Sequence, residues 1–321
     1  MEDTDFYKIF FPLWNDINDK ESFPKKRPLL AHYTSIESLE SILSNDEIWF
    51  SNPLYMNDIE ELKFGMLVGA NTFRQSNQLK SACKSDTRHK LLLDSFNYYF
   101  NEFDYKHAFD TYVFCLSEHD KDDSDGLLSM WRGYGGNGKG AAILFNLEKA
   151  NYVENSPIII SSVEYATTDQ RHKWIEEKIL QFSNLLAESN IPDGKLYLPA
   201  HYFFERLKLF SLFTKHKGFS EEREWRVVYM IERDINNKIG KMFHYEIGEN
   251  GIEPKLKLKI SPIDGIIGED VSLENLISKI ILGPTLSTPL AITAVQRMLD
   301  KIGKSSLTDK LIASTIPFRP I

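Results

Sequence analysis

Polar residues stand at the ends of three strand-like segments that are far apart in the chain. His32 lies in one such segment, Ser51 ends the next, and Glu222-x-Glu224 precedes the strand-like, mostly apolar residues 225–231. Side chains that a sheet presents at its strand ends are a common way to build a ligand cleft. We therefore predict that His32, Ser51 and Glu224 line one cleft.

Each of these features also has a structural explanation. A lone histidine in an apolar strand is more often a hydrogen-bonded core residue than a ligand. Glutamates followed closely by arginines, as in Glu222-x-Glu224-x-Arg226, often form a surface ion-pair ladder that contributes little energy. For the glutamates taken alone the ladder is the favoured interpretation, and only their combination with His32 and Ser51 favours a site.

Composition excludes several classes of protein. The 321 residues are 42% hydrophobic and 26% charged, which is ordinary for globular domains, and the net charge of −8 argues against a protein that coats nucleic acid. Cys83 and Cys115 have neither metal-ligand spacing nor the density of a secreted scaffold, which favours a cytoplasmic setting. No apolar run approaches the ~18 residues that span a bilayer, so we expect no membrane partner.

The hydrophobic pattern predicts a mixed α+β fold. Strands and helices interleave without the regular alternation of a doubly wound sheet. We expect residues 1–28 to form an N-terminal packing segment and residues 29–321 a single domain with helical insertions near 59–110 and 168–215. The predicted strands are residues 29–33, 48–51, 112–117, 141–145, 158–165, 225–231, 255–260 and 277–282.

The glycines of residues 133–140 match two nucleotide-binding patterns only by letter. A dinucleotide fingerprint follows a strand and opens a helix, whereas here a helix-like stretch precedes and a strand follows. Gly140 also replaces the hydroxyl residue of a phosphate-binding loop. We predict a flexible turn into a strand. The acidic residues 120–126 likewise fail as a calcium loop, because Lys121 and Arg132 would fall at ligand positions.

Five motifs recur in a fixed order and resemble the bacterial family catalogued as domain of unknown function 2971. The resemblance runs from about Leu29 to Leu282. The motifs are His32-Tyr33-Thr34, Ile48-Trp49-Phe50-Ser51-Asn52-Pro53, Met56-Asn57-Asp58-x-x-Glu61, Leu128-Ser129-Met130-Trp131-x-x-Tyr134 and Glu222-x-Glu224-Trp225-Arg226.

The order of His, Ser and a late Glu-x-Glu is in turn similar to ADP-ribosyltransferases, including the DarT-like toxins. That resemblance implies an ADP-ribosyltransferase-like mixed sheet core and NAD as co-substrate, with no metal. Glu224 would be the catalytic carboxylate and Glu222 would assist deprotonation of the acceptor. His32 would bind ribose hydroxyls, and Ser51 would support the ribose or orient the catalytic Glu. The remaining residues implied for the NAD site are Tyr33, Thr34, Asn57, Trp131 and Tyr134.

The acceptor of ADP-ribose is predicted from charge. Lys215, Lys217, Arg223 and Arg226 lie close to Glu224 in the sequence, and a basic rim beside a catalytic carboxylate suits a phosphate-bearing acceptor. We expect nucleic acid ahead of protein. DarT-like toxins act in bacterial conflict, so the resemblance implies a toxin or phage-defence effector with an antitoxin partner.

Two other functions stay open on the sequence alone. One is a metal-dependent nuclease, which Glu253-x-Lys255 and the acidic residues would favour. The other is a non-catalytic sensor module, in which the cleft only holds a nucleotide. Loss of nucleic-acid cleavage with a chelator would identify the first, and NAD binding without turnover would identify the second.

Overall fold

The fold is mixed α and β, as the sequence predicts, and the chain divides into two compact units. A computed structural model describes residues 3–17, 22–56, 62–151, 153–154, 156–248 and 251–318. Unit 1 comprises Met1–Asp19, Pro53–Asp110 and Val163–Phe219, and unit 2 comprises Lys20–Asn52, Thr111–Ser162 and Ser220–Ile321. The helical insertions near 59–110 and 168–215 thus fall in unit 1, together with the start of the chain.

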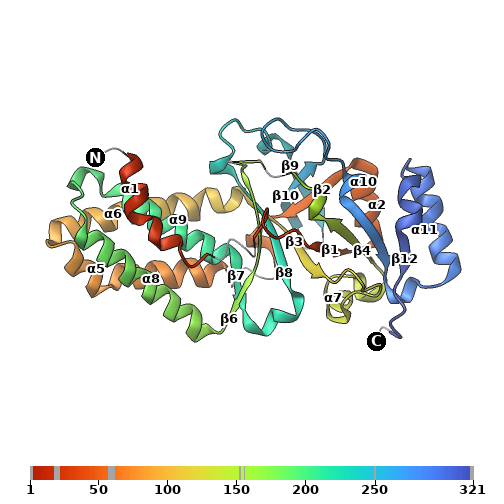
Figure 1. The fold of residues 1–321 in the computed structure, drawn as a ribbon, viewed down its shortest axis with the longest axis horizontal. Helices are drawn as coiled ribbons and strands as arrows, with labels where there is room; N and C mark the ends of the chain where they lie inside the picture. Colours follow the sequence, from red (N-terminus) through yellow and green to blue (C-terminus); the bar gives the residue numbers. More distant parts are fainter. Residues whose placement is uncertain are drawn as a thin grey trace. The chain divides into compact units, whose positions relative to one another are not determined.

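Unit 1 is mainly helical (Figure 1). The chain breaks between its two long C-terminal helices, with a 3₁₀ turn at Asp193–Lys195. Thr167 caps the first of these helices through a capping box with Gln170. The elements of unit 1 are α1 (Asp3–Phe10), α4 (Gly69–Gln75), α5 (Asn77–Ala82), α6 (Asp86–Tyr105), β6 (Glu164–Ala166), α8 (Thr168–Glu188), α9 (Tyr197–Phe213) and β7 (Thr214–His216).

Aromatic rings fill the interior of unit 1. Phe73 of α4 stacks on Phe96 of α6 with ring centroids 4.3 Å apart, and on Phe203 of α9 at 4.7 Å. Phe10 of α1 contacts Phe182 of α8 at 5.4 Å. Rings of this size bury large apolar areas, so these contacts tie α1, α4, α6, α8 and α9 into one core.

Unit 2 is built on a mixed sheet. Among the described residues the sheet has ten strands, in the order β12-β11-β4-β1-β3-β2-β10-β9, and β8 pairs with both β3 and β5. The strands are β1 (Leu29–Thr34), β2 (Glu47–Ser51), β3 (Thr111–His119), β4 (Ala141–Asn146), β5 (Ile158–Ser162), β8 (Glu224–Met230), β9 (Phe243–Gly248), β10 (Gly251–Lys259), β11 (Ile277–Leu282) and β12 (Leu311–Ala313).

Helices cover the two faces of this sheet unequally. One face carries the large core cluster, to which α2 (Ile36–Asn45), α10 (Leu273–Leu276) and α11 (Pro289–Lys301) contribute leucines, isoleucines and a valine. The opposite face carries a smaller cluster, to which the short helix α7 (Leu128–Gly133) contributes Met130 and Trp131. We call these the broad face and the α7 face.

The sheet forks along one edge of β3. β8 pairs with β3 from Thr111 to Ser117, so β1 and β2 must both use the other edge. There β1 pairs with the end of β3, through Leu29 opposite His119 and Ala31 opposite Ser117, whereas β2 pairs only at Val113. β1 and β2 therefore diverge from β3 between residues 113 and 117.

The glycine-rich segment is a turn between α7 and β4, as predicted. α7 ends at Gly133, and β4 begins at Ala141. Gly140 closes the turn against β1, because a Cβ built on Gly140 would lie 2.0 Å from the carbonyl oxygen of Thr34. The segment therefore needs glycine for close backbone packing inside the protein.

We predict that Gly140→Ala destabilises unit 2 by roughly 3 kcal/mol, because the added methyl forces β1 and the turn apart. Gly133→Ala is the matched control, since nothing lies within 4 Å of a Cβ built there. Denaturant unfolding of both variants measures the difference. Equal stability of the two variants would show that the turn yields easily.

Candidate functional site

His32 lies at the fork, and its side chain is on the broad face of the sheet. Its Nδ1 is 3.1 Å from the carbonyl oxygen of Cys115, between the two points where β1 and β2 pair with β3. Its ring packs on Phe114, with centroids 4.4 Å apart. A carbonyl only accepts, so Nδ1 carries the proton and donates it. His32 thus donates a hydrogen bond to the backbone of β3 between the points where β1 and β2 pair with it.

Burial sets the protonation state of His32. Desolvation outweighs the hydrogen bond to Cys115 and lowers the pKa of the imidazole to about 4. At neutral pH the ring is therefore uncharged, with Nε2 as its acceptor nitrogen.

Ser51 lies on the α7 face, at the far end of the fork. It is paired with Val113, and its hydroxyl accepts a hydrogen bond from Lys255 Nζ at 3.0 Å. Lys255 also forms an ion pair with Glu253 at 3.1 Å. The tripeptide that resembled a nuclease motif is thus paired within itself and with Ser51.

Glu224 begins β8 and is 5% exposed. Arg226 donates to both of its carboxylate oxygens, with Nε 2.7 Å from Oε1 and Nη2 3.2 Å from Oε2. Residues two apart on a strand point to the same face, so the spacing Glu-x-Arg itself produces this pair. Arg226 is also 5% exposed. Two buried, mutually neutralised charges of this kind are an internal ion pair rather than a surface ladder.

The sheet register does not bring His32, Ser51 and Glu224 together, which corrects the predicted single cleft. Glu224 pairs with Ser117, and Ser117 pairs with Ala31, so Glu224 and Ala31 share a face. His32, the next residue, is on the opposite face. Ser51 shares the face of Glu224. However, their partners on β3, Val113 and Ser117, are four residues or about 13 Å apart along the strand.

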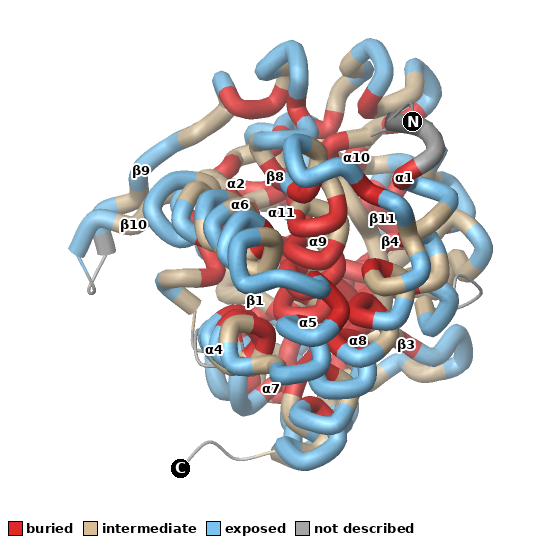
Figure 2. The backbone as a smooth tube through the Cα atoms, turned by 90° about the vertical axis from the view of Figure 1, so that its left-hand side faces the viewer, coloured by how far each residue is buried: buried red, intermediate tan, exposed pale blue. Residues whose placement is uncertain are grey.

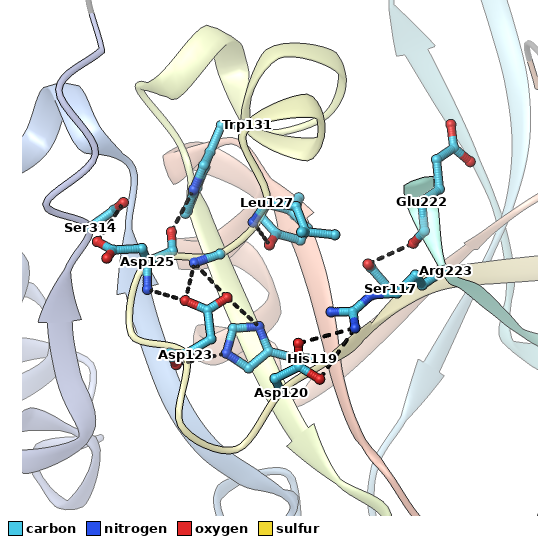
Figure 3. A network of polar contacts seen from close by, with 12 residues as sticks. Ser117, His119, Asp120, Asp123, Asp125, Leu127, Trp131, Glu222, Arg223 and Ser314 are labelled. Atoms are coloured by element: carbon cyan, nitrogen blue, oxygen red, sulfur yellow. Dashed lines mark hydrogen bonds and ion pairs between the residues drawn. The ribbon is translucent and has the colours of Figure 1, made fainter. Parts of the chain in front are cut away.

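Of the two glutamates in this motif, Glu222 is the less buried, and Figure 3 shows it beside Ser117 and Arg223. The half-buried residue lies just before β8, where Ser117 donates from Oγ to its backbone carbonyl at 2.7 Å. Arg223, which follows, has a backbone φ of +44°, a conformation that residues other than glycine rarely adopt. Two contacts hold that turn: the Arg223 carbonyl accepts from Glu118 N at 2.9 Å, and its guanidinium donates to Asp120 at 3.1 Å.

The acidic loop beside this turn is ordered by its own side chains (Figure 3). His119 is 5% exposed, and its Nε2 is 3.0 Å from the backbone carbonyl of Asp123. The Asp123 carboxylate accepts from the backbone N–H of Asp125 at 2.8 Å and of Gly126 at 3.1 Å. Asp125 then accepts from Ser314 and from Thr315, whose backbone N–H is the main cause of its lowered pKa. The loop is thus a fixed support for Asp120.

Aromatic residues predicted to stack on a ligand divide into buried and exposed ones. Trp131 is fully buried, and its Nε1 donates to the Asp125 carbonyl at 2.8 Å. Tyr33 packs edge-on against Trp131 at 4.9 Å, and burial raises the pKa of its hydroxyl to about 12. Both rings belong to the α7-face cluster. Tyr134 is 44% exposed, and its hydroxyl donates to Glu222 Oε1 at 3.1 Å. Only Tyr134 therefore offers a ring face to a ligand in this arrangement.

Most of the predicted basic rim for an acceptor is buried or paired with carboxylates. In unit 1, Lys215 is 1% exposed and lies over the Phe219 ring, while Lys217 is exposed. In unit 2, Arg226 is engaged by Glu224 and Arg223 by Asp120. Because of this burial and ion pairing, most of the positive charges that lie close together in the sequence do not form an exposed surface for an acceptor.

Thr34 and Asn57 are the other residues predicted for the NAD site. Thr34 is the half-buried last residue of β1 and pairs with Ala141. Asn57 lies outside the described residues, as do the neighbouring Asp58 and Glu61 of the same motif.

The sequence analysis did not predict that Asp120, Asp123 and Asp125 support the turn at Arg223. The sequence analysis excludes calcium binding by this loop but predicts no structural role for it. An Asp two residues before another polar residue and three before a glycine is the signal of a side-chain-capped turn, and it identifies Asp123. Ser314 and Thr315 carry no comparable signal, because they contact Asp125 across 189 and 190 residues of chain.

Comparison with known proteins agrees with the family resemblance. The family model described as "protein of unknown function (DUF2971)" matches residues 130–227, a range that contains both Tyr134 and Glu222. No curated protein and no solved structure matches the chain. Within the described residues, no group of three or more metal-binding side chains is found, and no helix combines the length and apolarity needed to cross a membrane.

The depressed pKa of His32 predicts acid sensitivity of unit 2. The pKa of His32 is about 4 in the folded chain and 6.5 in the unfolded chain. Between these pH values the unfolded chain binds a proton that the folded chain does not bind, so the free energy of unfolding falls as pH drops through this window. We expect a loss of about 2 kcal/mol between pH 7 and pH 5 from this residue. His32→Asn, which keeps a donor near Nδ1 but does not titrate, removes that part of the pH dependence in denaturant unfolding. An unchanged slope would contradict the assignment.

The buried pair predicts unequal effects of two neighbouring arginines. Arg226→Met leaves the Glu224 charge buried without its bidentate partner, and we expect a loss of about 3–5 kcal/mol. Arg223→Met breaks only a partly exposed pair, which contributes under about 1 kcal/mol. Combining Arg226→Met with Glu224→Gln restores most of the lost stability, as measured by thermal or denaturant unfolding. Equal losses for the two single variants would show that the Glu224 pair is not special.

Proposed function

We propose that this protein cleaves NAD and transfers the ADP-ribosyl group, with Glu222 as the working carboxylate and Tyr134 as the ring beside the nicotinamide. The observation that carries the proposal is the contact between the Tyr134 hydroxyl and Glu222 Oε1 at 3.1 Å, at the surface of unit 2. It joins a carboxylate to a half-exposed aromatic face inside the segment that matches the family.

The chemistry needs these two groups. Departure of nicotinamide breaks its bond to the ribose and leaves oxocarbenium character on the sugar, which a nearby carboxylate stabilises electrostatically. An acceptor hydroxyl or water then bonds to that carbon and loses its proton, and Glu222 is a base that can take it. A stacked ring holds the nicotinamide and limits access of water to the sugar.

This proposal moves the central role from Glu224 to Glu222. The Glu224 carboxylate is buried and held on both oxygens by Arg226, so its charge is already matched. Glu222 is half-buried, and the strained turn at Arg223 fixes its backbone. A carboxylate at the surface with a fixed backbone suits a ligand better than one inside an ion pair.

The acceptor is left open between nucleic acid and protein, because Lys215 and Arg226 are buried. An enzyme of this kind fits a toxin or phage-defence effector that an antitoxin restrains, as the resemblance implies. A sensor that holds NAD in the same corner without turnover is the rival function.

We predict that Glu222→Gln lowers nicotinamide release from NAD by about 100-fold or more, because the amide cannot stabilise the developing positive charge. Glu221→Gln is the matched control, since Glu221 is the exposed neighbouring glutamate. Release is followed with purified protein, alone and with cell lysate as acceptor. Equal rates for wild type and Glu222→Gln would remove the proposed role, and NAD binding without release under every condition would favour the sensor.

A further inference from the structure

The β9–β10 hairpin extends beyond the sheet of unit 2. β10 pairs with β2 only from Lys255 to Lys259, whereas it pairs with β9 from Gly251 to Leu256. Residues 245–248 and 251–254 therefore form a ribbon of two strands, and Figure 2 shows much of it as exposed. In the part of the chain that the structure describes, no strand pairs with the outer edge of β9.

This ribbon exposes large apolar side chains on one face. Tyr245 is 75% exposed, Ile247 is 84% exposed and Ile252 is 63% exposed. The register sets Ile247 opposite Ile252 and Tyr245 opposite Pro254, so all of them lie on the same side. A two-stranded ribbon is only marginally stable in water, and an open strand edge is a template for another strand. The hairpin is thus built to gain from a further strand.

The sequence of β9 is complementary to itself. It reads Phe243-His244-Tyr245-Glu246-Ile247. When two copies run antiparallel with Tyr245 at the centre, Tyr245 faces Tyr245 of the second copy, His244 faces Glu246, and Phe243 faces Ile247. His244 and Glu246 then lie on one face of the new sheet, where their side chains can hydrogen-bond, and the apolar residues and Tyr245 lie on the other face. Each His–Glu pair occurs twice, because the arrangement has two-fold symmetry.

We propose that a second copy of this chain docks on the β9 edge and forms an antiparallel, two-fold strand pair centred on Tyr245. The two ribbons then become one four-stranded sheet, which covers the free edge of each copy. The two-fold axis closes the assembly at a dimer, because each copy uses its β9 edge once. A contact of this size is small, so we expect a dissociation constant in the micromolar range.

Cysteine cross-linking tests the register directly. In the proposed pair, the two residues at position 245 lie about 4.5–5.5 Å apart at Cα, within disulfide range. We predict that Tyr245→Cys forms a disulfide-linked dimer under mild oxidation. Glu246→Cys alone does not, because its two copies would be offset by roughly 8 Å at Cα. Mixing Glu246→Cys with His244→Cys restores the cross-link. The native protein is the background control, since Cys83 is buried and Cys115 is half-buried.

Sedimentation of the full chain over a wide concentration range gives the second readout. Glu246→Lys faces His244 with a cation twice per dimer, and we expect at least about tenfold weaker association. Leu290→Lys is the matched control, an exposed apolar position on α11 at 82% exposure. A chain that stays monomeric throughout, or cross-links that form equally at positions 245 and 246, would overturn the proposal. Neither result would bear on NAD cleavage, so the two proposals fail separately.

Discussion

The register of β3 against its neighbours is the constraint on which the rest of unit 2 depends. Ser117 faces Ala31 on one side and Glu224 on the other, and a strand alternates its side chains between two faces. This single pairing decides that Glu224 and Tyr33 share the α7 face while His32 lies on the broad face. A shift by one residue would exchange every one of these assignments. The polar motif residues therefore cannot be gathered by their order in the chain alone.

The same constraint separates two kinds of charged group. Within β8, the buried Glu224 is tolerated because Arg226 donates to both of its oxygens, and the contact at 2.7 Å has the length of a strong charge-assisted hydrogen bond. Just before β8 the chain leaves the sheet through the left-handed turn at Arg223, and Glu222 reaches the surface beside Tyr134. The strain of that turn is held by the acidic loop through Asp120. Burial thus separates the structural Glu224 from Glu222, for which we propose the reactive role, although the two residues are only two positions apart.

Much of the fold could be predicted from the sequence, because apolar periodicity reports burial. The strands around Trp49, Val113, Ile143 and Ile280 are confirmed, as is the turn before β4. The site was harder. Which face His32 takes depends on pairing with a strand about 80 residues away, which no local pattern encodes. The Glu224–Arg226 pair was readable in principle, since Glu-x-Arg on a strand sets both side chains on one face. Its burial could not be predicted, because a buried ion pair and a surface ion-pair ladder have the same sequence pattern.

The central claim is that the corner formed by Tyr134 and Glu222 holds the ligand, while His32 and the Glu224–Arg226 pair are structural. Hydrogen–deuterium exchange of the full chain with and without NAD tests it most directly, because bound ligand slows exchange in the backbone that it orders. The account predicts protection of residues 131–139 and 220–223, with little change in residues 29–34. Protection of residues 29–34 and 47–51 without any change at 131–139 would contradict it and return the site to the strand ends that carry His32 and Ser51.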